Sequence, residues 1–345
     1  MSRKKGGRRP ESDGGTILSR ALPRAGRTVR LLLKMILPIS FGVGLLRYTG
    51  LLERIGQLCA PAMAFLRLPG EAAVALVSGL LAGIYALAGA MTVLNLTPAE
   101  LTVLCATALV AHNLIVECTV QHRAGTPWWW MLGVRLLFGA LVGATVAWSV
   151  AGLQWLHVPA LWLRFVPTAA SPTLAQGGDF HAFLIGWLND TARLVLKLVI
   201  IVTGMMVVTE WIRSSGTMAR LEATCRPALR FLGLADAVAY LWLTAQILGV
   251  AYGAGLLIEE TREEGRYRRE DVRALNSSIG ISHSLFEDTV VLASLGASLV
   301  WIIVPRILFA ALAVRLLRPL RLGLRRPAVP AVPAEGSRSP GSAGV

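Results

Sequence analysis

Residues 128–152 read WWWMLGVRLLFGALVGATVAWSVAG, an apolar run in which Arg135 is the only charged residue. A helix needs roughly 20 mostly apolar residues to cross a bilayer, and this run is long enough. Inside lipid the backbone must bond within a helix or a closed barrel, and the run is too long and unbroken for a barrel strand. The stretch therefore predicts a membrane-spanning helix, with the tryptophans at its start lying at the interface.

The rest of the 345-residue chain has the same character, since 54% of its residues are hydrophobic and 16% are charged. A soluble domain carries about 25% charged residues. About eight segments approach the length of a span. We predict an all-α polytopic membrane protein with membrane segments at about 30–46, 70–94, 98–121, 128–152, 190–212, 236–258, 273–296 and 298–317. The amphipathic stretches 50–68 and 213–233 are expected to lie at the interface.

The net charge of +14 raises the question of nucleic-acid binding, but the position of the charges argues against it. Basic residues crowd the N-terminal tail and the flank that follows the last apolar segment. This is the positive-inside pattern, and it predicts a multi-pass protein of the inner membrane with both termini in the cytoplasm. We expect the bilayer to be a partner, with anionic lipid against the tails, and no nucleic acid.

A second feature is an internal repeat. Matched residues of rare type keep their order along the chain: Arg30 with Arg193, Cys59 with Cys225, Gly83 with Gly249, His112 with His283, Trp130 with Trp301, and Arg135 with Arg306. Chance similarity between apolar helices would match leucine and valine, but it would rarely match these residues in order. We predict two homologous repeats of about four membrane segments each, at 29–153 and 190–318. A connection covers 154–189, and residues 1–28 and 319–345 are expected to be disordered tails.

Two polar clusters lie inside apolar sequence, one in the third segment of each repeat. Residues 111–119 read AHNLIVECT and residues 280–289 read GISHSLFEDT. On a continuous helix His283 and Glu287 would share a face. His112 and Glu117 would point about 140° apart, so either that helix is broken or the two serve different neighbours. Because the polar run 276–280 competes with helical bonding, we expect a broken or re-entrant third segment in each repeat.

Ionisable side chains at such depth cost at least about 2.5–3.5 kcal/mol each, so they normally face a cavity or a bundle interior. A buried His–Glu pair can also simply hold two helices together, and the repeated arginines can pair with carboxylates or snorkel to the surface. No catalytic residue, cofactor or metal site is predicted. The predicted substrate- or ion-binding residues are His112, Asn113, Glu117, His283, Ser284, Glu287 and Asp288, with Arg135, Arg306, Asn276 and Ser277 supporting them.

Residues 83–89 with 111–117, and 249–255 with 280–288, resemble the Gate family, also called nucleoside-recognition-domain membrane proteins. The likeness covers roughly 30–150 and 190–317. The family includes spore maturation membrane proteins, the membrane part of ferrous-iron permeases and, distantly, concentrative nucleoside transporters. The resemblance implies a membrane site for a small polar solute or ion, and oppositely oriented repeats of three crossings each. The GTPase domain of the iron permeases is not found, which weighs against iron uptake.

These observations favour a permease with alternating access, whose site for a nucleoside-like solute or an ion lies at the repeat interface. The alternative is a non-transporting membrane scaffold or assembly factor of the spore-maturation type. A membrane hydrolase is a third reading, but no Walker, HExxH, Rossmann or serine-elbow motif appears, so we do not expect an enzyme. A homo-oligomer or a membrane partner remains open for either of the first two.

Overall fold

The computed structural model describes residues 17–151, 179–262 and 266–318, and every regular element in these ranges is a helix. The helices of the first half are α1 (Ile17–Tyr48), α2 (Leu51–Ala64), α3 (Ala72–Ala82), α4 (Ile84–Met91), α5 (Pro98–Ala111), α6 (Leu114–Arg123) and α7 (Trp128–Ala151). Those of the second half are α8 (Phe180–Ser214), α9 (Thr217–Thr224), α10 (Arg226–Leu232), the 3₁₀ turn η3 (Asp236–Val238), α11 (Ala239–Tyr252), α12 (Ala254–Arg262), α13 (Arg269–Ser282), α14 (Glu287–Ser294) and α15 (Leu299–Leu317).

Five helical segments of the described ranges are long and apolar enough to cross a membrane: α1, α5 with α6, α7, α8 and α15. A sixth arises if α10, η3 and α11, which bend by 118°, count as one span. Helix α5 is buried along most of its length, whereas α1, α7, α8 and α15 expose large apolar side chains. Such faces suit lipid, and the fold is that of an all-α polytopic membrane protein, as predicted.

The prediction of single helices at 70–94 and 236–258 was wrong, because each segment bends back at a glycine. Gly83 separates α3 from α4 with φ 89° and ψ −176°, and Gly249 interrupts α11 with φ 73° and ψ 168°. These angles lie in a region that is essentially restricted to glycine. After the first bend Leu87 packs against Gly79, and after the second Gly253 lies beside Thr244. The second segment of each half is therefore a short hairpin.

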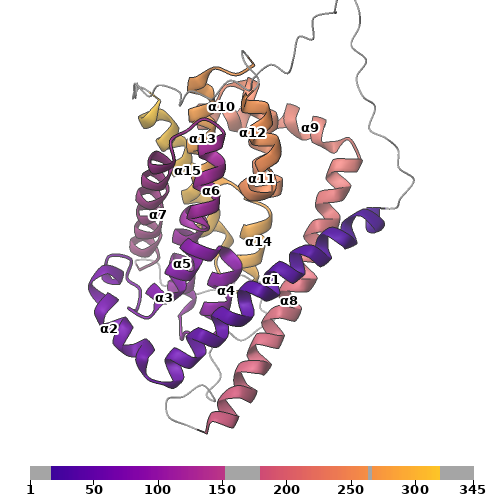
Figure 1. Cartoon of the computed structure of the whole chain (residues 1–345). Helices are drawn as coiled ribbons and strands as arrows, with labels where there is room; N and C mark the ends of the chain where they lie inside the picture. The colour runs from indigo at the N-terminus through magenta and orange to yellow at the C-terminus, as the bar shows by residue number, and fades with distance from the viewer. Residues whose placement is uncertain (1–16, 152–178, 263–265, 319–345) are drawn as a thin grey trace, which may run out of the picture.

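The third segment of each half is broken, but it does not turn back. Helix α5 ends at Ala111 and α6 begins at Leu114, and together they remain one 26-residue span. Helix α13 ends at Ser282 and α14 begins at Glu287. In Figure 1, α6 lies above α5, whereas α14 lies below α13. The sequence correctly indicated a break here, but it placed the fold-back one segment too late.

Helix α1 begins at Ile17, earlier than predicted, so residues 17–28 are not a disordered tail. Its buried residues recur at Ala21, Ala25, Thr28, Leu32 and Ile36, which is helical spacing. Helices α1 and α8 pack against each other along this region. The many basic residues of this region suggested a disordered tail, but they lie on the exposed faces of the helix, between the small buried residues. The tails 1–16 and 319–345 and most of the predicted connection lie outside the described residues.

Helix α5, which leads to the first polar cluster, begins with a capping box. The Thr97 hydroxyl accepts a hydrogen bond from the Glu100 amide at 3.3 Å, and the Glu100 carboxylate accepts one from the Thr97 amide at 2.7 Å. We expect Thr97→Ala to lower the free energy of unfolding by about 1 kcal/mol, because it removes the cap. Thermal unfolding of the purified protein in detergent measures the loss. Thr49→Ala is the control, since the Thr49 hydroxyl, just after α1, donates only to carbonyls in the last turn of α1, and an equal loss there would contradict the capping argument.

Candidate functional site

The break between α5 and α6 is set by two backbone conformations. His112 is extended, with φ −69° and ψ 158°. Asn113 is left-handed, with φ 50° and ψ 40°, a conformation that asparagine tolerates better than most residues. The Asn113 amide then donates to the Gly79 carbonyl at 3.0 Å. The amide freed by the break is thus satisfied by the neighbouring hairpin, whose tip glycine, Gly83, lies against the Asn113 side chain.

The break after α13 repeats this arrangement. His283 is extended, with φ −67° and ψ 167°, and Ser284 is left-handed, with φ 51°. The Ser284 amide donates to the Ala245 carbonyl at 3.1 Å. The tip glycine of the second hairpin, Gly249, lies against the Ser284 side chain. Both polar clusters are therefore helix breaks, each held by a hairpin, and in each the histidine is the last residue before the left-handed turn.

A buried arginine caps each break from the fourth segment of the same half. Arg135 on α7 donates to the carbonyls of Val110 at 2.9 Å and His112 at 2.8 Å. Arg306 on α15 donates to the carbonyls of Ile281 at 3.3 Å and His283 at 2.5 Å. Both side chains are fully buried, so neither snorkels to the surface. Arginine at the C-terminal end of a helix satisfies freed carbonyls and complements the helix dipole.

The two histidines meet between the halves. Their Nε2 atoms are 3.4 Å apart and their ring centroids are 5.0 Å apart. Both rings are almost completely buried. The Nδ1 atoms point away, His112 towards the Ala108 carbonyl at 3.2 Å and His283 towards the Ile279 carbonyl at 2.7 Å. Each ring is thus fixed by the carbonyl one helical turn before it, so that Nε2 faces its counterpart.

Carboxylates surround this pair. Glu117 of α6 approaches His112 Nε2 at 3.2 Å with Oε1, and His283 Nε2 at 3.0 Å with Oε2. Asp288 of α14 approaches His112 Nε2 at 3.3 Å. Arg135 Nη1 lies 2.6 Å from Glu117 Oε2, as an ion pair that is poorly aligned for a hydrogen bond. We call these five residues, His112, Glu117, Arg135, His283 and Asp288, the polar centre.

The polar centre is rich in acceptors. A carbonyl can only accept, so each histidine Nδ1 carries a proton and donates it. In the neutral ring Nε2 is then a bare acceptor, and two such atoms face each other and two carboxylates. Arg135 faces Glu117 Oε2 from one side. Facing lone pairs in a buried place are costly unless a positive charge lies between them, so the arrangement requires at least one cation, either a proton or a metal ion.

The structure reverses what helical spacing predicted for the two His–Glu pairs. His112 and Glu117, which would point apart on a continuous helix, are in contact because the break lies between them. Glu287, expected to share a face with His283, follows the second break and instead accepts a hydrogen bond from Tyr85 of α4 at 3.2 Å. Spacing rules fail here because they assume an uninterrupted helix.

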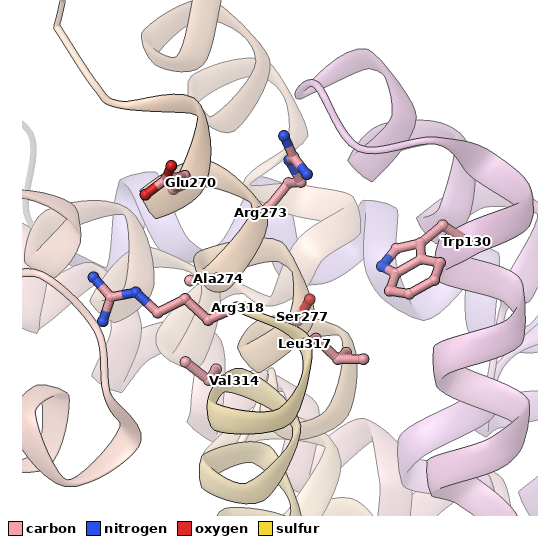
Figure 2. Close-up of a pocket in the computed structure, with 8 residues that line it drawn as sticks. All are labelled: Trp130, Glu270, Arg273, Ala274, Ser277, Val314, Leu317 and Arg318. Carbon is pink, nitrogen blue, oxygen red and sulfur yellow. The ribbon is translucent and has the colours of Figure 1, made fainter. Parts of the chain in front are cut away.

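The other predicted residues take supporting or separate places. Ser284 Oγ accepts a hydrogen bond from the Asp288 amide at 3.3 Å. The Asn276 side chain donates to Thr126 Oγ1 at 2.8 Å, and the Asn276 backbone carbonyl accepts from Gln121 Nε2 at 2.9 Å, which joins α13 to the end of α6. Ser277 lines a pocket with Trp130, Glu270, Arg273 and Arg318, as Figure 2 shows. Asn276 and Ser277 are therefore not part of the polar centre.

Sequence reasoning missed two contributors, Tyr85 and Thr289. Thr289 accepts a hydrogen bond from Arg306 Nη1 at 3.2 Å, and Tyr85 bonds Glu287 from the first hairpin. The position of Tyr85 two residues after Gly83 was a usable signal. It became meaningful only once that glycine was known to be a hairpin tip.

The sequence of the first half is similar to a known family of membrane proteins. Residues 29–117 match the Gate family model, described as nucleoside recognition. The Gate match runs from α1 to Glu117, and so includes the first hairpin, the first break and two residues of the polar centre. Over 268 residues the chain is 28% identical to the uncharacterized membrane protein YvoD of Bacillus subtilis (strain 168), covering 76% of this chain and 81% of that protein. No solved structure matches the chain. The chain is a multi-pass membrane protein, and part of its first half is similar to the Gate family.

Proposed function

We propose that this protein is a permease of the inner membrane that moves a small polar solute, nucleoside-like in size and polarity, or an ion by alternating access. The polar centre is the binding site. The observation that carries the proposal is a buried, acceptor-rich cluster at the place where two broken helices and two hairpins meet. Helix breaks next to a polar solute or ion are the usual construction of binding sites in secondary transporters.

A scaffold protein would need the same helices but a different interior. Buried polar groups that only hold helices together are normally paired donor to acceptor. Here two ring nitrogens and two carboxylates converge on each other, an arrangement that needs a proton or a metal ion between them. This favours a binding role over the non-transporting assembly factor.

The proposal includes two repeats in inverted orientation, with both termini in the cytoplasm. Matched residues touch each other. His112 contacts His283, and Phe138 contacts Phe309, which lie three residues after the matched Arg135 and Arg306, with ring centroids 6.2 Å apart. A residue can contact its own counterpart only close to a two-fold axis. The opposite directions of α5–α6 and α13–α14 in Figure 1 support an axis in the plane of the membrane. Alternating access then follows from movement of one repeat against the other around the polar centre.

Reconstitution into liposomes tests the proposal. We expect purified protein to take up at least one solute from a labelled panel of nucleosides, nucleobases and mono- and divalent cations. In His283→Ala and Glu117→Gln that flux should fall to the level of empty vesicles, because both changes remove groups from the polar centre. His122→Ala is the matched control, since His122 is exposed outside it, and it should retain the flux.

Two results would count against the permease. One is the absence of flux for every member of the panel. The other is a flux that His283→Ala and Glu117→Gln leave unchanged. If these variants reduce only protein abundance in the membrane, and the wild type carries no flux, the assembly-factor alternative is favoured instead.

A further inference from the structure

The two histidines of the polar centre are arranged as metal ligands usually are. A metal-bound imidazole almost always donates its other ring N–H to a carbonyl or carboxylate, which fixes the ring. His112 and His283 both donate Nδ1–H to the carbonyl four residues earlier, in two separate helices. The two Nε2 atoms are thereby held in place, 3.4 Å apart. The sequence alone predicted no metal site.

Distances between the potential ligand atoms fit one small ion. His112 Nε2 lies 3.4 Å from His283 Nε2 and 3.3 Å from Asp288 Oδ2. All three atoms lie within 4.8 Å of one another. Metal–ligand bonds of about 2.0–2.2 Å in tetrahedral geometry separate neighbouring ligand atoms by roughly 3.3–3.6 Å. Two of the separations already match, and the ion needs little movement of Asp288 to complete the third.

The polar centre also offers an anionic ligand for such an ion. Two carboxylates, Glu117 and Asp288, face the imidazoles, and Glu117 is paired with the Arg135 guanidinium. Because the Arg135 guanidinium pairs with Glu117, this carboxylate lies next to the ligands as an ion-paired neighbour, and Asp288 supplies the anionic ligand. Nitrogen ligands from two imidazoles select against Na⁺, Mg²⁺ and Ca²⁺, which prefer oxygen, and favour Zn²⁺, Fe²⁺ or Co²⁺.

We propose that the polar centre binds one divalent first-row transition metal ion through His112 Nε2, His283 Nε2 and the Asp288 carboxylate. The inference deepens the proposed function, since it names the cation at the site on which that function rests. The ion takes one histidine from each half of the chain. It therefore joins the two helix breaks, and the fourth position is open to water or to a solute group.

Metal binding by the purified full-length chain tests the inference. The protein is prepared with a tag that lacks histidine, stripped with a chelator and titrated with Co²⁺ and Zn²⁺ in detergent. We expect one metal ion per chain and, for Co²⁺, the intense visible absorption of a tetrahedral complex. His283→Gln should weaken binding by at least about 100-fold. His122→Gln, at an exposed histidine, should bind as the wild type does.

Asp288→Asn provides a second variant in case His283→Gln fails to fold, because the Asp288 side chain is 13% exposed and lies at the edge of the cluster. It should also weaken metal binding, while its melting temperature without metal stays near that of the stripped wild type. The inference is overturned if the wild type binds no stoichiometric Co²⁺ or Zn²⁺, or binds only Ca²⁺ or Na⁺. It is also overturned if a folded Asp288→Asn or His283→Gln variant binds metal as tightly as the wild type.

This experiment separates the metal ion from the transport activity. Stoichiometric binding without any flux in liposomes would support the metal site and contradict the permease. Solute flux by a protein that binds no metal would support the permease and overturn the metal site, leaving protons as the cations between the two histidines.

Discussion

Replacing Arg135 by methionine is expected to be among the most damaging single substitutions in this protein, with a loss of about 3–5 kcal/mol in the free energy of unfolding. The side chain is fully buried, and three partners would lose it: the Glu117 carboxylate and the carbonyls of Val110 and His112. Methionine has similar length but no charge, so the glutamate would remain buried without its guanidinium partner. Arg306→Met should also be strongly destabilising, because it leaves the carbonyls of Ile281 and His283 unpaired.

The measurement is the melting temperature in detergent, with recovery of folded protein as a second readout. Arg220→Met is the control, since Arg220 is exposed on α9, and it should change stability little. Arg135→Lys should fall between the wild type and methionine, because an ammonium keeps the charge but cannot hold the carbonyls and the carboxylate in one fork. Melting temperatures for Arg135→Met and Arg220→Met that agree within error would show that the capping role is wrong.

The second large effect is expected at the hairpin tips. Gly83→Ala and Gly249→Ala should each cost about 1–3 kcal/mol, because alanine does not tolerate the backbone angles found there. Space is not the obstacle: a Cβ at either position would meet its nearest neighbour at an ordinary 3.7 Å. The cost is therefore conformational, and it should also displace the amide bonds that hold Asn113 and Ser284 in the two breaks.

A glycine within a membrane helix provides the control, since its replacement by alanine should not lower the stability. Gly204 lies within α8 with open space around its Cβ position and no positive φ. Gly204→Ala should therefore leave the protein as stable as before, or stabilise it by about 0.5–1 kcal/mol. Thermal unfolding of the three alanine variants side by side is the measurement. If Gly83→Ala and Gly249→Ala behave like Gly204→Ala, the glycines are not required for the bends.

The sequence predicted the class of the fold and the location of its polar segments. Long apolar runs with few charges are a direct consequence of the lipid environment, and His112, Glu117, His283 and Asp288 stood out as ionisable residues within them. Their contacts could not be derived, because a helix break changes which residues face each other. Spacing therefore favoured His283 with Glu287, whereas the contacts are His112 with Glu117 and His283 with Glu117.

The hairpins escaped prediction for a different reason. Gly83 and Gly249 stand in stretches rich in glycine and alanine, where small residues normally indicate close helix packing. Composition alone does not distinguish a packing glycine such as Gly89, which lies against the α1 backbone, from one that must adopt a positive φ. The start of α1 at Ile17 was missed because pairing of Arg24 with Glu210 of α8 depends on a contact between distant parts of the chain.

The contact between His112 and His283 has a consequence for the proposed metal ion, because its ligands come from both halves of the chain. Neither half offers the full set of proposed ligand atoms, so a cation can be fully coordinated only when the two halves are aligned. If one half moved by a few ångströms, each imidazole would keep only its backbone carbonyl partner, and the two could no longer bind the same cation. A cation that binds the aligned arrangement more tightly also stabilises that arrangement, by the difference between its binding free energies for the two arrangements. In the proposed permease, binding of the cation and alignment of the two halves therefore occur together, and release requires the halves to separate.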